Sequence, residues 1–239
     1  RWRLEEARRA DVAFCLSRFV AQQVMQRVTL RSERIQPLFH PDLTYGASLA
    51  NRQLHGDRLR LLFIGRIMQY KGLGLLVDAV ELLRQRGVPV HLCVAGHGAL
   101  GKDADRLHRL GCEVINRWID DEEMGALLAR HDAVVCPHIE ASQSGVAAVA
   151  LGSCMPVVAT PVGGLTEQVV DGVTGVLATQ ATPEAFADAI VRLACDATLY
   201  ANISRHLTDT AQERSMETFL GAVRQVVERG RTTAEACTK

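Results

Sequence analysis

The stretch LRLLFIGRIMQYKG, residues 59–72, joins a hydrophobic run to a glycine-bounded loop that carries two cations. Its first six residues are almost continuously apolar, which is typical of a strand buried on both faces. The loop that follows has a glycine at each end and places Arg66 and Lys71 five positions apart. Because a helix is expected to start directly after the loop, its N-terminus adds to the attraction for an anion. The stretch therefore predicts either a pyrophosphate site or two ordinary surface cations.

The same alternation of apolar runs and amphipathic stretches continues along the chain. It predicts an α/β fold, a doubly wound parallel sheet of the Rossmann-like type with helices on both faces. Ligands bind such sheets at the carboxyl ends of the strands. We expect strands at 59–64, 90–95, 113–116, 133–136, 156–159 and 175–178, and helices at 73–86, 103–110, 121–130, 144–151, 183–194, 197–213 and 215–229.

Residues 1–50 do not follow this rhythm. They suggest a helix at 3–10, a strand at 12–16, a second helix capped by Ser17 and an apolar segment near 35–38. We interpret residues 1–50 as the remnant of another domain with its connection, residues 51–229 as the sheet domain, and residues 230–239 as a frayed tail. A chain that opens with Arg-Trp-Arg in an expected helix is interpreted as a fragment of a longer protein or as a chosen boundary.

Composition excludes several classes of protein. The formal net charge is zero and the pI is about 7.2, so no bulk attraction to nucleic acid is expected. No apolar run is long enough for a membrane span, and nothing resembles a signal peptide. The seven cysteines include no C-x-x-C pair, so Cys93 and Cys136 are interpreted as buried apolar residues of a cytoplasmic protein, not as a disulfide or zinc framework. The arginines at 1, 3, 8 and 9 fit contact with the inner face of a membrane, or more commonly a solvated helix face.

The loop at residues 137–146 leads from an expected strand into an expected helix. Ser142 or Ser144 can cap that helix, and its free first-turn amides can bind a phosphate. Gly145 allows a ligand to approach the backbone closely. Glu140 would repel a phosphate but could bind sugar hydroxyls beside it; the alternative is a cap or an ion-pair partner.

Three further loops follow expected strands. The G-x-G-x-x-G at residues 96–101 matches a dinucleotide fingerprint, but a glycine-rich turn is the better interpretation because the motif follows the second strand. His97 within it is interpreted as solvated or structural. Trp118 either frames a nucleobase or packs between loops. The glycines at 163 and 164 predict a tight turn, and the nearby Glu167 is expected to be structural.

Taken together, these motifs resemble family 4 glycosyltransferases of the GT-B fold, specifically the C-terminal, donor-binding domain of glycosyl transferases group 1. The resemblance extends over residues 5–229, and residues 10–17 resemble the last strand of the family's N-terminal domain. The signatures are G-R-x4-K-G at 65–72, V-A-G-x-G at 94–98, E-x-S-Q-S-G-V at 140–146, P-V-V-A-T-x-V-G-G-x-x-E at 156–167 and D-G-x-T-G at 171–175.

The resemblance implies a role for each candidate residue. Arg66 and Lys71 would hold the diphosphate of a nucleotide-sugar donor and stabilise charge on the leaving group. Ser144 and the backbone amides of Gly145 and Val146 would hold the distal phosphate. Glu140 would face the donor sugar. The backbone at Arg117, Trp118 and Ile119 would hold the base. Family members transfer sugar with retention of configuration, without a protein nucleophile, and no metal or other cofactor is expected.

Two departures from the family pattern limit these expectations. Ala148 stands where a second glutamate usually contacts the ribose, so that contact is absent. The glycine-rich loop and polar residues of the N-terminal domain are also missing, so the fragment should bind donor weakly and turn over little. The acceptor is an unidentified saccharide, lipid or small molecule. A vestigial nucleotide-binding module, an NAD-dependent oxidoreductase and a sugar-nucleotide epimerase are the alternatives.

Overall fold

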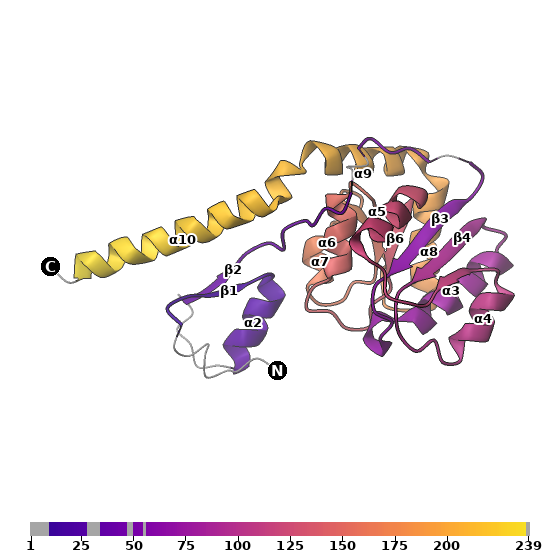
Figure 1. Ribbon diagram of the computed structural model, residues 1–239, viewed down its shortest axis with the longest axis horizontal. Coiled ribbons are helices and arrows are strands. Elements are labelled where there is room, and N and C mark those ends of the chain that lie inside the picture. Colours follow the sequence, from indigo (N-terminus) through magenta and orange to yellow (C-terminus); the bar gives the residue numbers. More distant parts are fainter. Residues whose placement is uncertain (1–9, 28–33, 47–49, 55, 238–239) are drawn as a thin grey trace.

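The computed structural model describes residues 10–27, 34–46, 50–54 and 56–237, and its centre is a six-stranded sheet (Figure 1). The strand order is β5-β4-β3-β6-β7-β8, and every neighbouring pair is parallel. This order is that of a Rossmann-like sheet, as predicted. The strands are β3 (Leu59–Ile64), β4 (Val90–Ala95), β5 (Glu113–Ile115), β6 (Ala133–Cys136), β7 (Val157–Ala159) and β8 (Gly175–Leu177).

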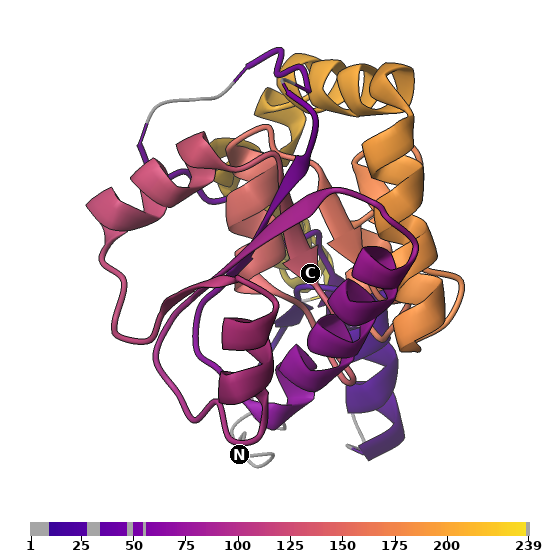
Figure 2. The same ribbon diagram turned by 90° about the vertical axis from the view of Figure 1, so that its right-hand side faces the viewer.

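Helices cover both faces of the sheet, as the alternation of strands and helices predicts (Figures 1 and 2). On one face, α3 (Leu73–Gln85) packs against both α4 (Asp103–Arg109) and α8 (Pro183–Cys195). The other face carries α5 (Asp121–Arg130), α6 (Gly145–Gly152) and α7 (Leu165–Gln168). The four residues of β6 are all buried, because helices cover the strand on both sides.

The order of the strands reverses between β3 and β6, which are neighbours although the chain visits β4 and β5 between them. The loops that leave these two strands diverge over opposite faces of the sheet, and ligands of such folds bind in the crevice at this switch point. The two loops are those that carry Arg66 and Lys71 on one side and Glu140 to Val146 on the other. The topology therefore brings both candidate segments to one place.

Local capping explains where α5 begins. The Asp120 carboxylate accepts a hydrogen bond from the Glu123 amide at 2.8 Å, and Asp120 with Glu123 three positions later has the spacing of a capping box. The Glu123 side chain does not complete the box, because its two oxygens accept hydrogen bonds from Arg117 at 2.6 Å each. This ion pair fixes the loop after β5 to the first turn of α5.

A smaller unit precedes the sheet domain. It pairs β1 (Ala13–Cys15) with β2 (Ile35–Pro37) in parallel and covers them with α2 (Arg18–Arg27). The predicted strand and the helix after Ser17 are confirmed, whereas the helix expected at 3–10 lies outside the described residues. Both carboxylate oxygens of Glu167 accept backbone amides at the start of α2, each at 2.7 Å. Glu167 thus caps a helix of the other unit, which is a structural contact.

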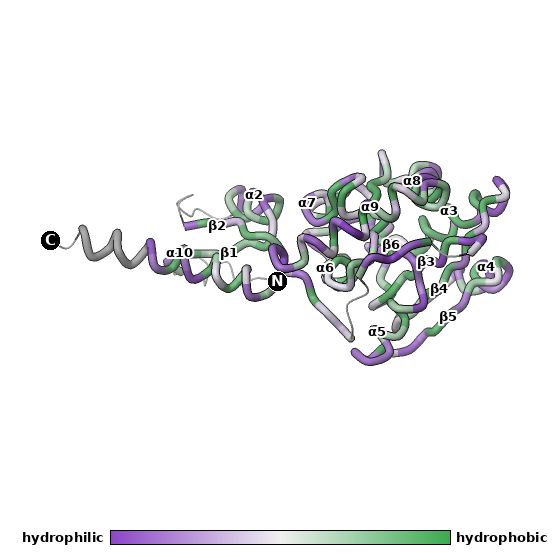
Figure 3. Tube along the Cα trace, turned by 90° about the horizontal axis from the view of Figure 1, so that it is seen from above, coloured by the Kyte–Doolittle hydropathy of each residue, from purple (hydrophilic) through white to green (hydrophobic). Residues whose placement is uncertain are grey.

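The chain ends in α9 (Ala197–Asp209), the short helix η3 (Gln212–Arg214) and α10 (Met216–Cys237). We expected the last helix to stop near residue 229; instead α10 continues through Gly230 to Cys237. The fraying expected for residues 230–239 stays a prediction. This helix projects away from the sheet domain, and hydrophobic and hydrophilic residues alternate along its coloured part (Figures 1 and 3). Within the described part of the chain, no helix has both the length and the apolar character to span a bilayer.

Candidate functional site

Two loops at the switch point are fastened to each other through their backbones. The amide of Ile139, after β6, donates to the carbonyl of Tyr70, after β3, at 2.8 Å. Gly72 has φ +71°, and a Cβ on it would lie only 1.8 Å from the carbonyl oxygen of Pro137. Position 72 therefore accepts only glycine, and this glycine allows the two loops to meet.

Lys71, the last residue of η2 (Gln69–Lys71), turns back toward the start of α6. Its Nζ lies 3.4 Å from the point where a Cβ on Gly65 would be, and the Val146 Cγ2 lies 3.2 Å from the same point. The ammonium group and the first turn of α6 are therefore neighbours. Burial, together with the nearby Arg66 guanidinium, lowers the pKa of Lys71. Arg66 itself is exposed, and two neighbouring cations favour the binding of an anion between them.

The start of α6 presents free backbone amides. The Ser144 hydroxyl caps the helix by accepting the Ala147 amide at 3.2 Å. The amides of Gly145 and Val146 come next in the first turn, where helical geometry provides no acceptor, and no hydrogen bond from either is present in the described structure. Nothing lies within 4 Å of the Cβ position of Gly145. This open helix end suits an anionic group.

Gln168 is a residue of this site that the sequence did not reveal. Its side chain binds Ser144 twice, accepting the backbone amide at 2.6 Å and donating to the carbonyl at 3.1 Å. A residue of α7 thus fixes the backbone of Ser144, and Ser144 is only 3% exposed. The hydroxyl of Ser144 is engaged as a cap, and direct contact between this hydroxyl and a phosphate stays a prediction.

Glu140 lies on the exposed side of the same loop. It forms no ion pair with any described residue, which leaves its carboxylate available to the crevice. The loop around it is held by Gly163 and Gly164, whose Cβ positions would lie 1.8 and 1.9 Å from the carbonyl oxygens of Ala141 and Ser142. The tight turn predicted at 163–164 therefore supports the loop that carries Glu140.

The G-x-G-x-x-G motif serves loop packing. A Cβ on Gly96 would lie 1.9 Å from the Gly65 carbonyl oxygen, and one on Gly98 would lie 2.3 Å from that of Ile67. The Ile67 amide donates to the carbonyl of His97 at 2.9 Å, while the His97 side chain is exposed. Backbone of the neighbouring loop occupies the space beside both glycines, so the interpretation as a glycine-rich turn is the one that the geometry favours.

Arg117, Trp118 and Ile119 follow the edge strand β5, three strand spacings, or ~14 Å, from β6. Ile119 is buried, whereas Trp118 is 73% exposed and does not pack between loops, one of the two alternatives expected for it. The neighbouring Arg117 guanidinium donates hydrogen bonds to Glu123 and to the Trp118 carbonyl, which fix the backbone of this loop. Residues 117–119 lie on the same edge as the cationic loop, and within the described residues no hydrogen bond joins the two segments.

His138 is the second residue that the sequence did not single out. It is 3% exposed, and its Nδ1 has no hydrogen-bond partner within the described residues. Burial, and then the charge of Lys71, lowers the pKa of His138 to about 4. Its ring meets that of Tyr70 edge-on, with the centroids 6.1 Å apart. A neutral, buried imidazole therefore lies beside the cationic loop.

Ala148, where the family pattern usually has its second glutamate, is fully buried in α6. Its carbonyl accepts the amide of Leu43, from the connection that leads into the sheet domain, at 3.2 Å. A long acidic side chain at this position would enter the protein interior. The substitution is therefore consistent with the packing of this chain.

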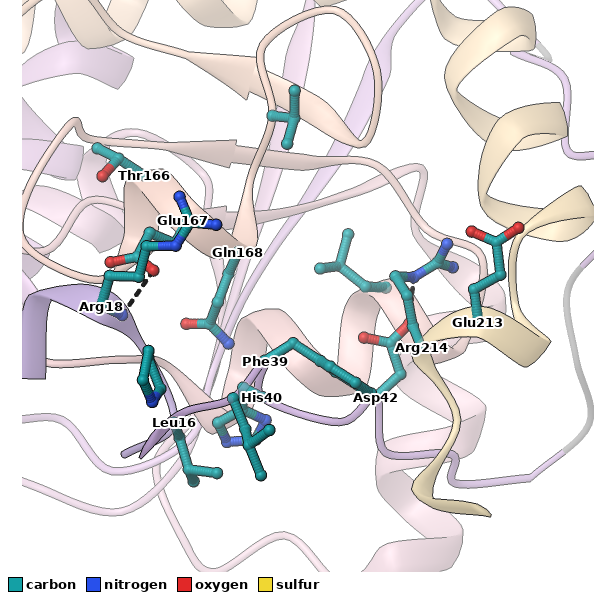
Figure 4. Close-up of a pocket in the computed structure, with 14 residues that line it drawn as sticks. Leu16, Arg18, Phe39, His40, Asp42, Thr166, Glu167, Gln168, Glu213 and Arg214 are labelled. Carbon is teal, nitrogen blue, oxygen red and sulfur yellow. Dashed lines mark hydrogen bonds and ion pairs between the residues drawn. The ribbon is translucent and has the colours of Figure 1, made fainter. Parts of the chain in front are cut away.

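A cavity of 570 Å³ lies between the smaller unit and the sheet domain (Figure 4). Its labelled lining includes Glu167 and Gln168 on one side and Asp42, paired with Arg214 at 2.7 Å, on another. None of the predicted site residues lines this cavity. Of the residues that line the cavity, only Gln168 also contacts the candidate site, through its two hydrogen bonds to Ser144. The crevice at the sheet edge therefore remains the better candidate for ligand binding.

Comparison with known proteins agrees with this geometry. The sequence model of the family described as Glycosyl transferases group 1 matches residues 58–196, which include both loops at the switch point. The chain belongs to this family. A D-inositol 3-phosphate glycosyltransferase of Kribbella flavida is 32% identical over 189 residues, which are 72% of this chain and 45% of that protein. The chain thus spans about half the length of this group 1 relative.

Solved structures of glycosyltransferases share the fold. Sucrose-phosphate synthase from Thermosynechococcus elongatus superposes with a TM-score of 0.70 at 21% identity, covering 98% of this chain and 61% of the other. HepE from Anabaena, solved in complex with UDP-glucose, gives a TM-score of 0.71 at 22% identity and covers 98% and 66%. These neighbours confirm the fold of this group 1 chain, which corresponds to part of each larger enzyme.

Proposed function

We propose that this chain binds the nucleotide-sugar donor of a retaining glycosyltransferase in the crevice between β3 and β6. The observation that carries the proposal is the meeting of the Lys71 ammonium with the first turn of α6, beside Gly65. A diphosphate placed there receives positive charge from Arg66 and Lys71 on one side. On the other side it receives hydrogen bonds from the amides of Gly145 and Val146.

The same groups provide the chemistry of transfer. When the bond between the anomeric carbon and the diphosphate oxygen breaks, negative charge grows on the leaving group, and Arg66 and Lys71 stabilise it without a metal. Glu140, which is exposed in the loop after β6, binds hydroxyl groups of the donor sugar. Retention follows when the acceptor oxygen attacks from the face that the diphosphate leaves, and the acceptor proton passes to a leaving-group oxygen.

The nucleoside extends from the diphosphate toward β5, where the backbone of Arg117 to Ile119 holds the base. A UDP-glucose complex of a protein with the same fold supports a nucleoside diphosphate sugar as the ligand class. The matched segment makes up only 45% of the Kribbella flavida relative, and we infer that residues outside the matched segment bind the acceptor. The described residues alone are therefore expected to bind donor and to turn over little.

Isothermal titration calorimetry with UDP, GDP and their sugars tests the proposal. Arg66→Ala and Lys71→Ala should each weaken binding about tenfold or more, because each removes a charge-assisted contact worth roughly 1.5–3 kcal/mol. Arg58→Ala and Lys102→Ala are the matched controls, since both side chains are exposed and lie outside the crevice. Affinity should be unchanged by EDTA. Equal affinities for all four variants would refute the diphosphate site, and binding without transfer by the complete protein would favour a vestigial module.

A further inference from the structure

A second group of polar side chains lies within the sheet domain, below the carboxyl edge. Cys93, Glu113 and His131 each bring one ligand atom within 4.8 Å of the others. Cys93 and His131 are buried, and the Glu113 side chain is 39% exposed. A thiol, a carboxylate and an imidazole together form a ligand set that Zn²⁺ and Co²⁺ accept.

Strand register explains why these residues meet. Cys93 of β4 and Glu113 of β5 are directly paired in neighbouring parallel strands, so their side chains leave the sheet on the same face. His131 caps the C-terminus of α5, the helix that covers this face. Both strand residues lie two positions before the ends of their strands, so the cluster is separate from the loops of the donor site.

His131 is already oriented as a metal ligand would be. Its Nδ1 lies 2.6 Å from the carbonyl oxygen of Leu127, an acceptor that fixes the proton on Nδ1 and leaves the lone pair of Nε2 free. Metal-bound histidines characteristically use the second nitrogen in this way.

We propose that Cys93, Glu113 and His131 form a structural Zn²⁺ site. On binding, the Cys93 thiol loses its proton to solvent, and the metal then holds a thiolate, a carboxylate and a neutral imidazole. The site carries no net charge, which a largely buried position favours. Water completes the tetrahedron, or His91, which lies two positions before Cys93 on the same strand face and influences the charge state of His131.

To bind zinc, the three ligand atoms must come closer together, and the Cys93 thiol must lose its proton. Ligand atoms of a tetrahedral zinc lie roughly 3.5 Å apart, so no pair of these atoms, all within 4.8 Å of one another, must approach by more than about 1.3 Å. Rotation of the half-exposed Glu113 side chain can bring its carboxylate closer to the other two ligands. Burial and the Glu113 carboxylate raise the pKa of Cys93 to about 12 in the metal-free chain. A divalent cation between Cys93 and Glu113 offsets the repulsion between a thiolate and this carboxylate. In the metal-free alternative, the thiol hydrogen-bonds to Glu113 and Arg130 pairs with that carboxylate at 3.7 Å.

The site would fasten an edge of the sheet. β5 has only three residues and a single neighbour, β4. A metal bound to Glu113 ties this strand to β4 and to the end of α5 at once. Zinc is therefore expected to raise stability without changing the affinity of the donor crevice, which separates this inference from the proposed function.

Co²⁺ and Zn²⁺ titrations of the EDTA-treated chain test the inference. We expect a thiolate-to-cobalt charge-transfer band in the near ultraviolet at one Co²⁺ per chain. A hundredfold excess of free Zn²⁺ over its Kd should raise the Tm by about 5–10 °C. Cys93→Ser should abolish the band. Cys112→Ser and Cys195→Ser, which alter more exposed cysteines, should keep it.

Glu113→Gln is a variant that should still fold, because the Glu113 side chain is half exposed and glutamine has the same shape as glutamate. We expect it to weaken Co²⁺ binding at least tenfold with little change in the Tm of the metal-free chain. Absence of a charge-transfer band in the unaltered chain would overturn the inference. A band that survives Cys93→Ser but is lost in Cys112→Ser would also overturn it, as would binding that Glu113→Gln does not change.

Discussion

Replacing Gly72 by alanine should separate the two loops that form the candidate donor site. A side chain at φ +71° costs about 1–2 kcal/mol, because left-handed backbone crowds the Cβ atom. The added Cβ would also lie 1.8 Å from the Pro137 carbonyl oxygen, so one of the two loops must move by more than about 1 Å. That movement sacrifices the hydrogen bond from Ile139 to Tyr70, worth about 1 kcal/mol.

Gly87→Ala is the matched control for this substitution. Gly87 has φ +69°, almost the same backbone strain, but nothing lies within 4 Å of its Cβ position. Urea denaturation should therefore show Gly72→Ala to be about 2–4 kcal/mol less stable than Gly87→Ala. Calorimetry should show the affinity for a nucleoside diphosphate reduced at least tenfold in Gly72→Ala only. Equal losses of stability in the two variants, or full affinity in Gly72→Ala, would show that the loops are not held together as described.

Two further predictions concern buried ionisable groups. Because the pKa of His138 is lowered from 6.5 to about 4, the native state resists protonation. Acidification from pH 6.5 to 4 should therefore reduce the free energy of unfolding by about 3 kcal/mol through this residue, a slope that His138→Gln should lose in urea titrations. Asp132, 1% exposed, accepts two hydrogen bonds from the Arg60 guanidinium, at 2.6 and 2.9 Å. Asp132→Ala should cost about 3 kcal/mol in the same assay, against less than about 1 kcal/mol for Asp188→Ala, whose pair with Arg86 is exposed; similar costs would contradict this account.

The fold that the family resemblance implies agrees with the observed fold, because the motifs and the secondary-structure elements are both determined by residues close together in the chain. Each apolar run from residue 59 onward forms a strand of the sheet, and each expected helix of that domain is present. Ser144, one of the two serines proposed as the cap of the helix after residue 143, does cap that helix. These features depend on residues a few positions apart, where periodicity and side-chain capping act directly.

Predictions were weaker where the outcome depended on distant partners. Trp118 was expected either to frame a nucleobase or to pack between loops, and its 73% exposure excludes packing between loops. The end of α10 was placed too early. Gly230 is the one strong stop signal after residue 229, and α10 continues past it to Cys237. The helix proposed at 3–10 lies outside the described residues, and the roles of Arg66, Lys71 and Glu140 remain predictions for the binding experiments.

The sequence by itself determined the α/β class, the order of the elements and the two loops in which an anion site should be sought. Only the tertiary structure decided which groups share that site: Gln168 bound to Ser144, and beside Lys71 the buried His138, whose Nδ1 has no hydrogen-bond partner among the described residues. It also decided that Cys93, Glu113 and His131 form one cluster. The physical reason is that hydrophobic periodicity and turn chemistry act along the chain, whereas burial, hydrogen bonding and charge at a site depend on segments that strand order and register bring together.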